Sequence, residues 1–534
     1  MNKKQIGLIG VAAVATVAVV GGIICISLNS GSKEWSQKVS MRGVVDEDDV
    51  AHVALSNGKV VTVEDAMDVI LSSDEKKLIV MDKDENLYVS DLKGEHKKKI
   101  AKDCIMIYNN EGNFVSYASE GMHFAYASIE TGETLDCEPE FVYWPINDGN
   151  NDIIYFVDSE DEELKAWNGS KYITICEIDD AEYTRILSVN EKGNVIYASC
   201  NDDKAKVYIT KGSNSEKLCS INMEGRYSNI YMNNILGTNT GFLMASNDKH
   251  SGYFLDEKKK LHELDLDNDI VNVYTKNTDI KNTTDTAKEY YLVTTDDYDE
   301  YYNDYHSRSA LMNEDEYLEY QVIYVDKKYN TKEIIDDLKG AYISNGYLYY
   351  IDKHGNLYEA KLNGSRIKNE KEIDDDVVAI DPTSGNGYIY YVKNASDDGL
   401  QDLYVVKHGS EAKKICGNVE SYKSAYNSSY PSYDLKFAGD NHSTIYFFKN
   451  RKEDRNYSSH DTMTLCKYSF GDKDYEKIDN KVLLNNTLVD NRNLSDISRI
   501  TYCKQHEHDG EYSLDYCVYD GKKTKVLEED IKLK

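Results

Sequence analysis

Proline is nearly absent from this sequence, and the motifs that identify many enzyme classes are missing. The 534 residues contain four prolines, so turns must be built mainly from Gly, Asn and Asp. No G-x-S-x-G nucleophile elbow, phosphate-binding glycine loop or HExxH zinc motif occurs. These absences argue against the common serine hydrolases, nucleotide-binding enzymes and zinc peptidases. We therefore expect no catalytic residue, no cofactor and no metal.

Basic residues are also scarce relative to acidic ones. The chain has 62 Lys and Arg against 94 Asp and Glu, a net charge of −32. Lys3 and Lys4 are the charged residues among the first thirty, so the remainder carries 60 basic and 94 acidic side chains, a balance of −34. Such a surface repels phosphate backbones, which argues against nucleic-acid binding. We interpret the acidic charge as a feature that keeps the protein soluble. The alternative is that it binds cations or cationic partners.

Ten cysteines are present, but they form no CxxC pair and no zinc-like cluster. Cys503 and Cys517 lie seven residues on either side of Gly510, in a segment with the pattern of a hairpin. A symmetric turn would place them opposite each other, within reach of a disulfide. We therefore regard Cys503–Cys517 as a candidate disulfide. The alternative is two small buried residues.

An apolar run without charge lies near the start of the chain, from Ile6 to Leu28. Its 23 residues match the length that a helix needs to cross a hydrocarbon core of about 30 Å. The run is too long for the apolar core of a cleaved signal peptide, so we predict a single-pass signal anchor in the cell membrane. Lys3 and Lys4 favour a cytoplasmic tail at residues 1–5 and an extracytoplasmic body.

Tyrosine is abundant, with 45 copies against 10 phenylalanines, as suits half-buried β-strands. Two signatures recur with it. In the first, a tight turn leads into an apolar or aromatic strand, which is typical of hairpins. Its copies are Asp84–Tyr88, Glu111–Phe114, Lys192–Tyr197, Asn345–Tyr350, His354–Tyr358 and Asn386–Tyr391.

In the second signature, a glycine turn precedes a short strand that ends in Lys-x-Ile or a similar sequence. Most copies recur at intervals of about 36–50 residues, a spacing typical of propellers and solenoids. Several short strands per unit and little helical periodicity favour a β-propeller. The copies are Asp91–Ile100, Ala166–Ile175, Ile209–Leu218, Lys361–Ile373, Val406–Ile415 and Val518–Leu527.

The pattern of Tyr347–Ile373, with aromatic pairs, an Asp turn, LY, a Gly-Ser turn and a final Lys-Glu-Ile, resembles that of a known group. It is similar to bacterial propellers related to the YWTD repeats of lipoprotein-receptor proteins and to TolB. The resemblance covers roughly residues 75–530, although the YWTD tetrapeptide itself does not occur. It implies a ring of four-stranded blades that serves as a binding platform.

We therefore predict an all-β propeller of about eight four-stranded blades, with a range of seven to ten, at residues 50–534. Residues 29–49 would form a polar stalk after the anchor. Val50–Val63 would supply a strand that closes the ring against the C-terminal blade, and Glu64–Leu71 would form a short helix. The acidic, Tyr-rich segment 296–319 is predicted to be an insertion, either a solvated loop or a docking loop.

Three polar segments could suggest metal binding. Asp82–Asn86 begins like a calcium loop, but Leu87 stands where that loop requires glycine, so a hairpin turn is favoured. The alternating acids of residues 265–269 and the histidines His506 and His508 show no complete ligand set. We interpret them as solvated turn or strand residues.

These features predict a membrane-anchored, non-catalytic propeller that binds a protein or another envelope component as a scaffold or sensor. The alternative is a glycan- or polymer-acting propeller, either lectin-like or a hydrolase with carboxylates in the central channel. A structural cation-binding role is a third possibility. The residue usage suits a bacterium with an AT-rich genome.

Overall fold

The computed structural model describes residues 43–532 apart from several internal segments, and the described part is all-β. No helix occurs among these residues. The segments outside the description are 56–58, 73, 120–122, 138–145, 148–152, 159–160, 179–180, 182, 191, 202–203, 223–228, 236–237, 247–250, 267, 280–286, 296–318, 382–383, 394–399, 421–435, 439–441, 453–461, 484–499 and 509–510.

The strands follow one another as antiparallel meanders. The first half comprises β1 (Val44–Val45), β2 (Ala51–Ala54), β3 (Val60–Val63), β4 (Ala66–Leu71), β5 (Lys77–Asp82), β6 (Leu87–Asp91), β7 (Lys98–Ala101), β8 (Cys104–Glu111), β9 (Phe114–Ser119), β10 (His123–Ser128), β11 (Thr134–Cys137), β12 (Ile146–Asn147), β13 (Ile154–Asp158), β14 (Glu163–Trp167), β15 (Tyr172–Glu177), β16 (Tyr183–Val189), β17 (Val195–Asn201), β18 (Lys204–Lys211), β19 (Asn214–Asn222), β20 (Asn229–Asn234), β21 (Gly241–Ser246), β22 (Ser251–Leu255) and β23 (Leu261–Leu264).

The second half comprises β24 (Asp269–Tyr274), β25 (Tyr290–Thr295), β26 (Tyr320–Val325), β27 (Thr331–Ser344), β28 (Tyr347–Asp352), β29 (Leu357–Leu362), β30 (Ile367–Asp374), β31 (Val377–Ile380), β32 (Tyr388–Lys393), β33 (Leu400–Lys407), β34 (Lys413–Glu420), β35 (Lys436–Ala438), β36 (Thr444–Lys452), β37 (Thr462–Ser469), β38 (Glu476–Leu483), β39 (Ile500–His508), β40 (Glu511–Tyr519) and β41 (Thr524–Lys532).

Eight hydrogen-bonded sheets resolve into eleven repeat units in the described chain. Six sheets are separate units, β1–β3, β4–β7, β8–β11, β12–β15, β16–β19 and β20–β23. The seven-stranded sheet holds two units that share β27, because the first part of β27 pairs with β26 and the last part with β28. The eleven-stranded sheet holds three, β31–β34, β35–β38 and β39–β41, joined by one residue pair each. We number these units 1 to 11 in chain order.

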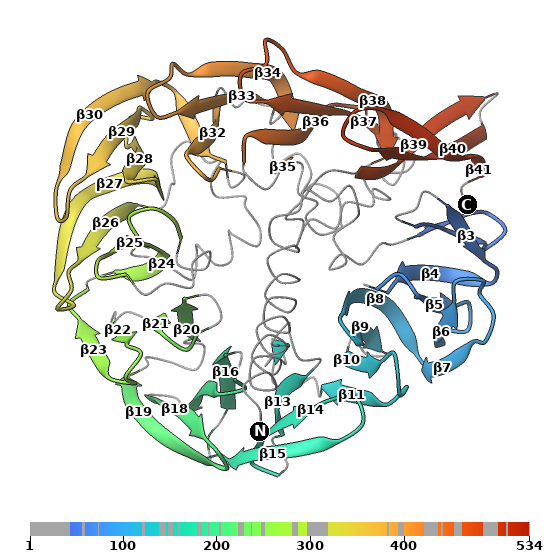
Figure 1. The fold of residues 1–534 in the computed structure, drawn as a ribbon, viewed down its shortest axis with the longest axis horizontal. Helices are drawn as coiled ribbons and strands as arrows, with labels where there is room; N and C mark the ends of the chain where they lie inside the picture. Colours follow the sequence, from blue (N-terminus) through green and yellow to red (C-terminus); the bar gives the residue numbers. More distant parts are fainter. Residues whose placement is uncertain are drawn as a thin grey trace, which may run out of the picture.

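The prediction of an all-β repeat fold is confirmed, whereas the predicted number of about eight units was too low. Nine of the eleven units are four-stranded, and the first and last are three-stranded. Figure 1 shows the units following one another around a ring, with the N-terminal units in blue next to the C-terminal units in red.

The core of the ring lies between consecutive units. Nine of its ten hydrophobic clusters combine buried side chains of two neighbouring units. The tenth joins units 10 and 11 to units 1 and 2, and includes Leu483, Tyr516, Val53 and Leu78. Each such unit is therefore a layer with two buried faces, which explains why strands such as β17 are buried at successive residues.

The segment Val50–Val63 faces the C-terminal unit, as predicted, but it does not join that sheet as a strand. It forms β2 and β3 of unit 1, which packs against unit 11. We call this contact between units 1 and 11 the seam. Two backbone N–H groups of unit 1 donate hydrogen bonds across it, Ala54 N–H to Tyr516 Oη at 3.1 Å and Glu47 N–H to the Lys532 carbonyl at 2.8 Å.

Seven described hairpin turns have the same construction, which accounts for three of the six copies of the first sequence signature. An Asp or Asn side-chain oxygen accepts the N–H groups two and four residues later. The residue three positions later has a positive φ, between 59° and 86°, which closes a three-residue hairpin loop. The turns begin at Asp46, Asp82, Asp91, Asn190, Asp256, Asp326 and Asp352. Part of the acidic excess is thus a set of structural carboxylates.

We expect Asp352→Ala to lower the free energy of unfolding by about 1–2 kcal/mol, because it removes the acceptor of two backbone N–H groups. Asp352→Asn keeps an oxygen there and should cost less than half as much. His354→Ala is the control, since His354 donates its backbone N–H to the turn. Urea denaturation followed by far-UV circular dichroism measures all three. Equal losses for Ala and Asn would contradict the role of the side-chain oxygen.

Three of these turns also form a backbone hydrogen bond with the following unit. This bond explains why the helix predicted at Glu64–Leu71 does not form. The positive-φ residues Asp49, Glu85 and Gly355 accept N–H bonds from Ala66, Cys104 and Val377, the first residues of β4, β8 and β31. A register shift follows each of these first residues.

The predicted helix at Glu64–Leu71 was therefore wrong, and its last six residues form β4. The register shift at Met67 interrupts the alternation of buried and exposed residues. The resulting spacing of apolar residues resembled that of a helix.

Candidate functional site

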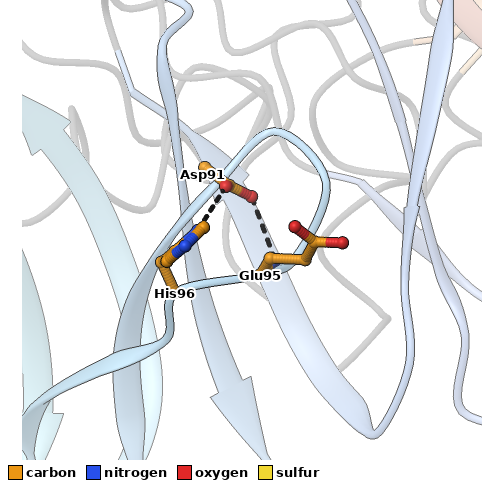
Figure 2. Close-up of side chains that lie close together, drawn as sticks. All are labelled: Asp91, Glu95 and His96. Atoms are coloured by element: carbon orange, nitrogen blue, oxygen red, sulfur yellow. Dashed lines mark hydrogen bonds and ion pairs between the residues drawn. The ribbon is translucent and has the colours of Figure 1, made fainter.

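One described group of side chains has the composition of a metal site. Asp91, Glu95 and His96 lie in the β6–β7 turn, and one ligand atom of each lies within 4.8 Å of the others. Figure 2 shows the His96 ring pointing at the Asp91 carboxylate, with 2.9 Å between Nδ1 and Oδ2. This hydrogen bond lowers the pKa of Asp91 and raises the pKa of His96.

The hairpin turn accounts for this cluster without a metal. Asp91 Oδ1 accepts the N–H groups of Lys93 and Glu95, as in the other six turns. In two other turns the second carboxylate oxygen also accepts a hydrogen bond from a side chain. Asn356 donates to Asp352 Oδ2, and His262 contacts Asp256 Oδ2. His96 thus donates to the second carboxylate oxygen of its turn, as Asn356 and His262 do in two other turns.

The other predicted polar segments are turn and strand residues as well. Asp82–Asn86 forms the β5–β6 hairpin turn, which confirms the interpretation favoured by the sequence. Asp265 is exposed, whereas Asp269 is buried at the start of β24. His506 Nε2 lies 2.6 Å from Asp515 Oδ2 of the neighbouring strand β40.

Cys503 and Cys517 lie in paired strands but do not face each other. The register pairs Cys503 with Tyr516 and Cys517 with Tyr502, one residue away from a hairpin centred on Gly510. A shift of one residue puts two side chains on opposite faces of a sheet. Both thiols are free and buried, Cys503 in the seam cluster and Cys517 in the cluster between units 10 and 11. This geometry matches the alternative of two small buried residues.

The seam carries a cleft that the sequence analysis missed. Its volume is about 230 Å³, and it opens between the β1–β2 turn and β41. The buried His52 ring separates two acids, with Nε2 3.0 Å from Asp46 Oδ2 and Nδ1 3.0 Å from Glu528 Oε2. The ionisable lining consists of the acids Asp46, Glu47, Asp48, Glu528, Glu529 and Asp530, the imidazole of His52 and the ammonium of Lys532.

A second unpredicted feature is the outer strand β15 of unit 4. Tyr172 and Ile173 begin this strand and are 55% and 50% exposed. The exposed residues of other outer strands are mainly charged, as with the lysines of β7 and the Lys and Glu residues of β30. The sequence could have indicated this exposed apolar strand, because Ala166–Ile175 ends in Tyr-Ile-Thr-Ile where other copies of the second signature carry lysine.

The remaining predicted segments lie largely outside the described residues. The anchor Ile6–Leu28 and residues 296–318 of the insertion are not described. Within the described ranges, no helix is long and apolar enough to cross a membrane. Of the predicted stalk, residues 43–49 are described and contribute Val44 to the seam cluster.

No family model matches the chain, and no curated protein matches it either. Among solved structures, it is similar to a eukaryotic initiation factor at 10% identity and TM-score 0.37, over 71% of this chain and 96% of the other. It is also similar to dipeptidyl peptidase 4 of Porphyromonas gingivalis, at 9% identity and TM-score 0.33, over 91% of this chain and 65% of the other. The β-propeller domain of the trilobed protease of Pyrococcus furiosus aligns at 14% identity and TM-score 0.25, over 58% and 94%. These similarities are too low to indicate a shared function.

Proposed function

We propose that this chain is a non-catalytic binding scaffold, a β-propeller of eleven blades held at the outer face of a membrane by Ile6–Leu28. The proposal includes capture of an extended segment of a protein partner at the outer edge of β15. The observation that supports this proposal most directly is the exposure of Tyr172 and Ile173 on the last strand of a sheet. The predicted resemblance to YWTD-related and TolB-like propellers is consistent with such a role.

The outer edge of β15 suits addition of a strand. This strand pairs with β14 on one side and ends its sheet on the other. An unpaired edge offers backbone N–H and C=O groups to an extended peptide, and natural proteins usually protect such edges with charge. The Tyr172 ring is held in place by Trp167 and Phe156, at centroid distances of 6.3 and 5.9 Å. The edge is therefore an ordered apolar surface.

The chemistry of β15 indicates which peptide would fit. Glu163 and Glu177 are directly opposite each other in the β14–β15 register. Like charges at such positions repel each other, and a basic residue of the partner would relieve that repulsion. Lys165 contacts Glu163 at 3.2 Å, whereas Glu177 is exposed. The expected partner is an extended segment with alternating apolar residues and a Lys or Arg at one end.

Selection from a displayed library of random peptides, with the full chain in lipid nanodiscs as target, tests the proposal. We expect enriched peptides to combine apolar alternation with a basic end. Ile173→Lys should weaken their binding at least tenfold, because it places a charge on the edge. Val526→Lys on β41 is the matched control and should leave affinity unchanged. Equal binding to the Ile173→Lys variant, or selected peptides without basic residues, would overturn the proposal.

A further inference from the structure

The seam contains an ionisable bridge between the two ends of the described chain. His52 on β2 contacts Asp46 of its own unit and Glu528 of unit 11, each at 3.0 Å. His52 and Glu528 are separated by 476 positions in the sequence. The His52 side chain is 9% exposed, so water competes little for its nitrogens.

The protonation state of the ring follows from its partners. Asp46 Oδ1 already accepts the N–H groups of Asp48 and Val50, so this carboxylate acts as an acceptor and Oδ2 needs a donor. An ionised Glu528 is also an acceptor. Two hydrogen bonds therefore require a proton on both ring nitrogens, whereas the neutral ring carries one.

The surroundings determine which contact is lost when the ring is neutral. Asp46 is fixed within the β1–β2 turn and its side chain is 16% exposed, whereas that of Glu528 is 32% exposed. The neutral ring thus keeps its bond to Asp46 and turns a lone pair towards Glu528. The contact that crosses the seam is the one that disappears.

The other charged groups at the seam are mainly acidic. Glu47 and Asp48 come from the β1–β2 turn, and Glu529 and Asp530 come from β41. The cations are Lys532, 3.8 Å from Glu47, and Lys83, which contacts Asp49 of the turn at 2.5 Å. From β40, Tyr516 Oη accepts the Ala54 N–H. A neutral His52 would leave the seam with acidic side chains on both sides.

We propose that His52 is a pH-dependent latch that holds units 1 and 11 together when its ring is protonated and releases Glu528 when the ring is neutral. Histidine is the side chain that changes charge between about pH 5 and 8, so the latch would respond to the pH outside the membrane. Beyond binding a partner, the ring would thereby open at a defined position between its first and last units.

Hydrogen exchange of the full chain tests the latch. We follow peptides containing Glu47 and Ala54, whose N–H groups cross the seam, and correct for the intrinsic pH dependence of exchange. Loss of one charge-assisted hydrogen bond corresponds to about a tenfold change in an opening equilibrium. Protection in the unmodified chain should therefore fall about tenfold between pH 5.5 and pH 8.

Variants distinguish the latch from general effects of pH. His52→Gln should abolish the pH dependence, because a glutamine does not titrate. Glu528→Gln should abolish it as well, because the amide can accept a hydrogen bond from the protonated His52 ring and donate one to the neutral ring. Glu528→Gln is the variant to use if His52→Gln fails to fold, since Glu528 is partly exposed. Glu359→Gln removes a similar pair, His408–Glu359, away from the seam and should behave like the unmodified chain. Protection that is constant with pH, or a pH dependence that survives Glu528→Gln, would overturn the proposal.

Discussion

Replacing Trp167 by alanine is expected to lower the free energy of unfolding by about 3–5 kcal/mol, the usual cost of deleting a large buried aromatic ring. Trp167 is fully buried at the junction of units 3 and 4. Its ring lies 5.1 Å from that of Phe114 on β9, and its cluster also includes Tyr126 and Ile154. Alanine would leave a cavity between two rigid sheets, which limits relaxation.

The loss of stability should begin in units 3 and 4, because the cluster that contains Trp167 joins these two neighbouring units. Hydrogen exchange should accelerate first in β9 and β14, and far-UV circular dichroism in urea gives the overall change. Tyr172→Ala is the control, since that ring is more than half exposed and should cost less than about 1 kcal/mol. A Trp167→Ala variant no less stable than Tyr172→Ala would show that the units are not held together by these clusters.

The turn chemistry of the fold was predictable, whereas the number of units was not. Strings such as Asp-x-x-Gly-Asn identify a hairpin locally, because the side-chain acceptor and the positive-φ residue lie within five residues, as at Asp352 and Gly355. The inner strands have no comparable signal. Three of them, β4, β8 and β31, begin with a bulge, and β27 belongs to two units at once. The number of turns recognised in the sequence therefore did not give the number of units.

The seam and the cysteine pair show two further limits of sequence patterns. Cys503 and Cys517 were predicted to face each other, but a register one residue different reverses that relation. The contact between His52 and Glu528 joins segments that are far apart in the sequence, so no local sequence pattern predicts it. Its nearest signal is the spacing of Asp46 and His52, which recurs at Asp256 and His262, where the same carboxylate–imidazole contact forms.

Raising the pH above about 9 is expected to unfold the chain cooperatively. Burial raises the pKa of Tyr291 and Tyr342 to about 12, and that of several thiols, including Cys104 and Cys200, also to about 12. Unfolded Tyr ionises near pH 10 and unfolded Cys near pH 8.5. The folded state holds these groups neutral, so their stabilisation is present below the unfolded pKa values and is lost as pH rises towards 12.

Tyrosinate absorbance during alkaline titration provides the measurement. We expect a cooperative step that coincides with loss of circular dichroism, because the buried hydroxyls ionise only on unfolding. Tyr291→Phe keeps the buried ring and removes one ionisable hydroxyl, so the variant should resist a higher pH than the unmodified chain while remaining folded at pH 7. A gradual titration of all 45 tyrosines without a step would contradict the prediction. It would mean that water reaches the clusters between the units while the sheets remain intact.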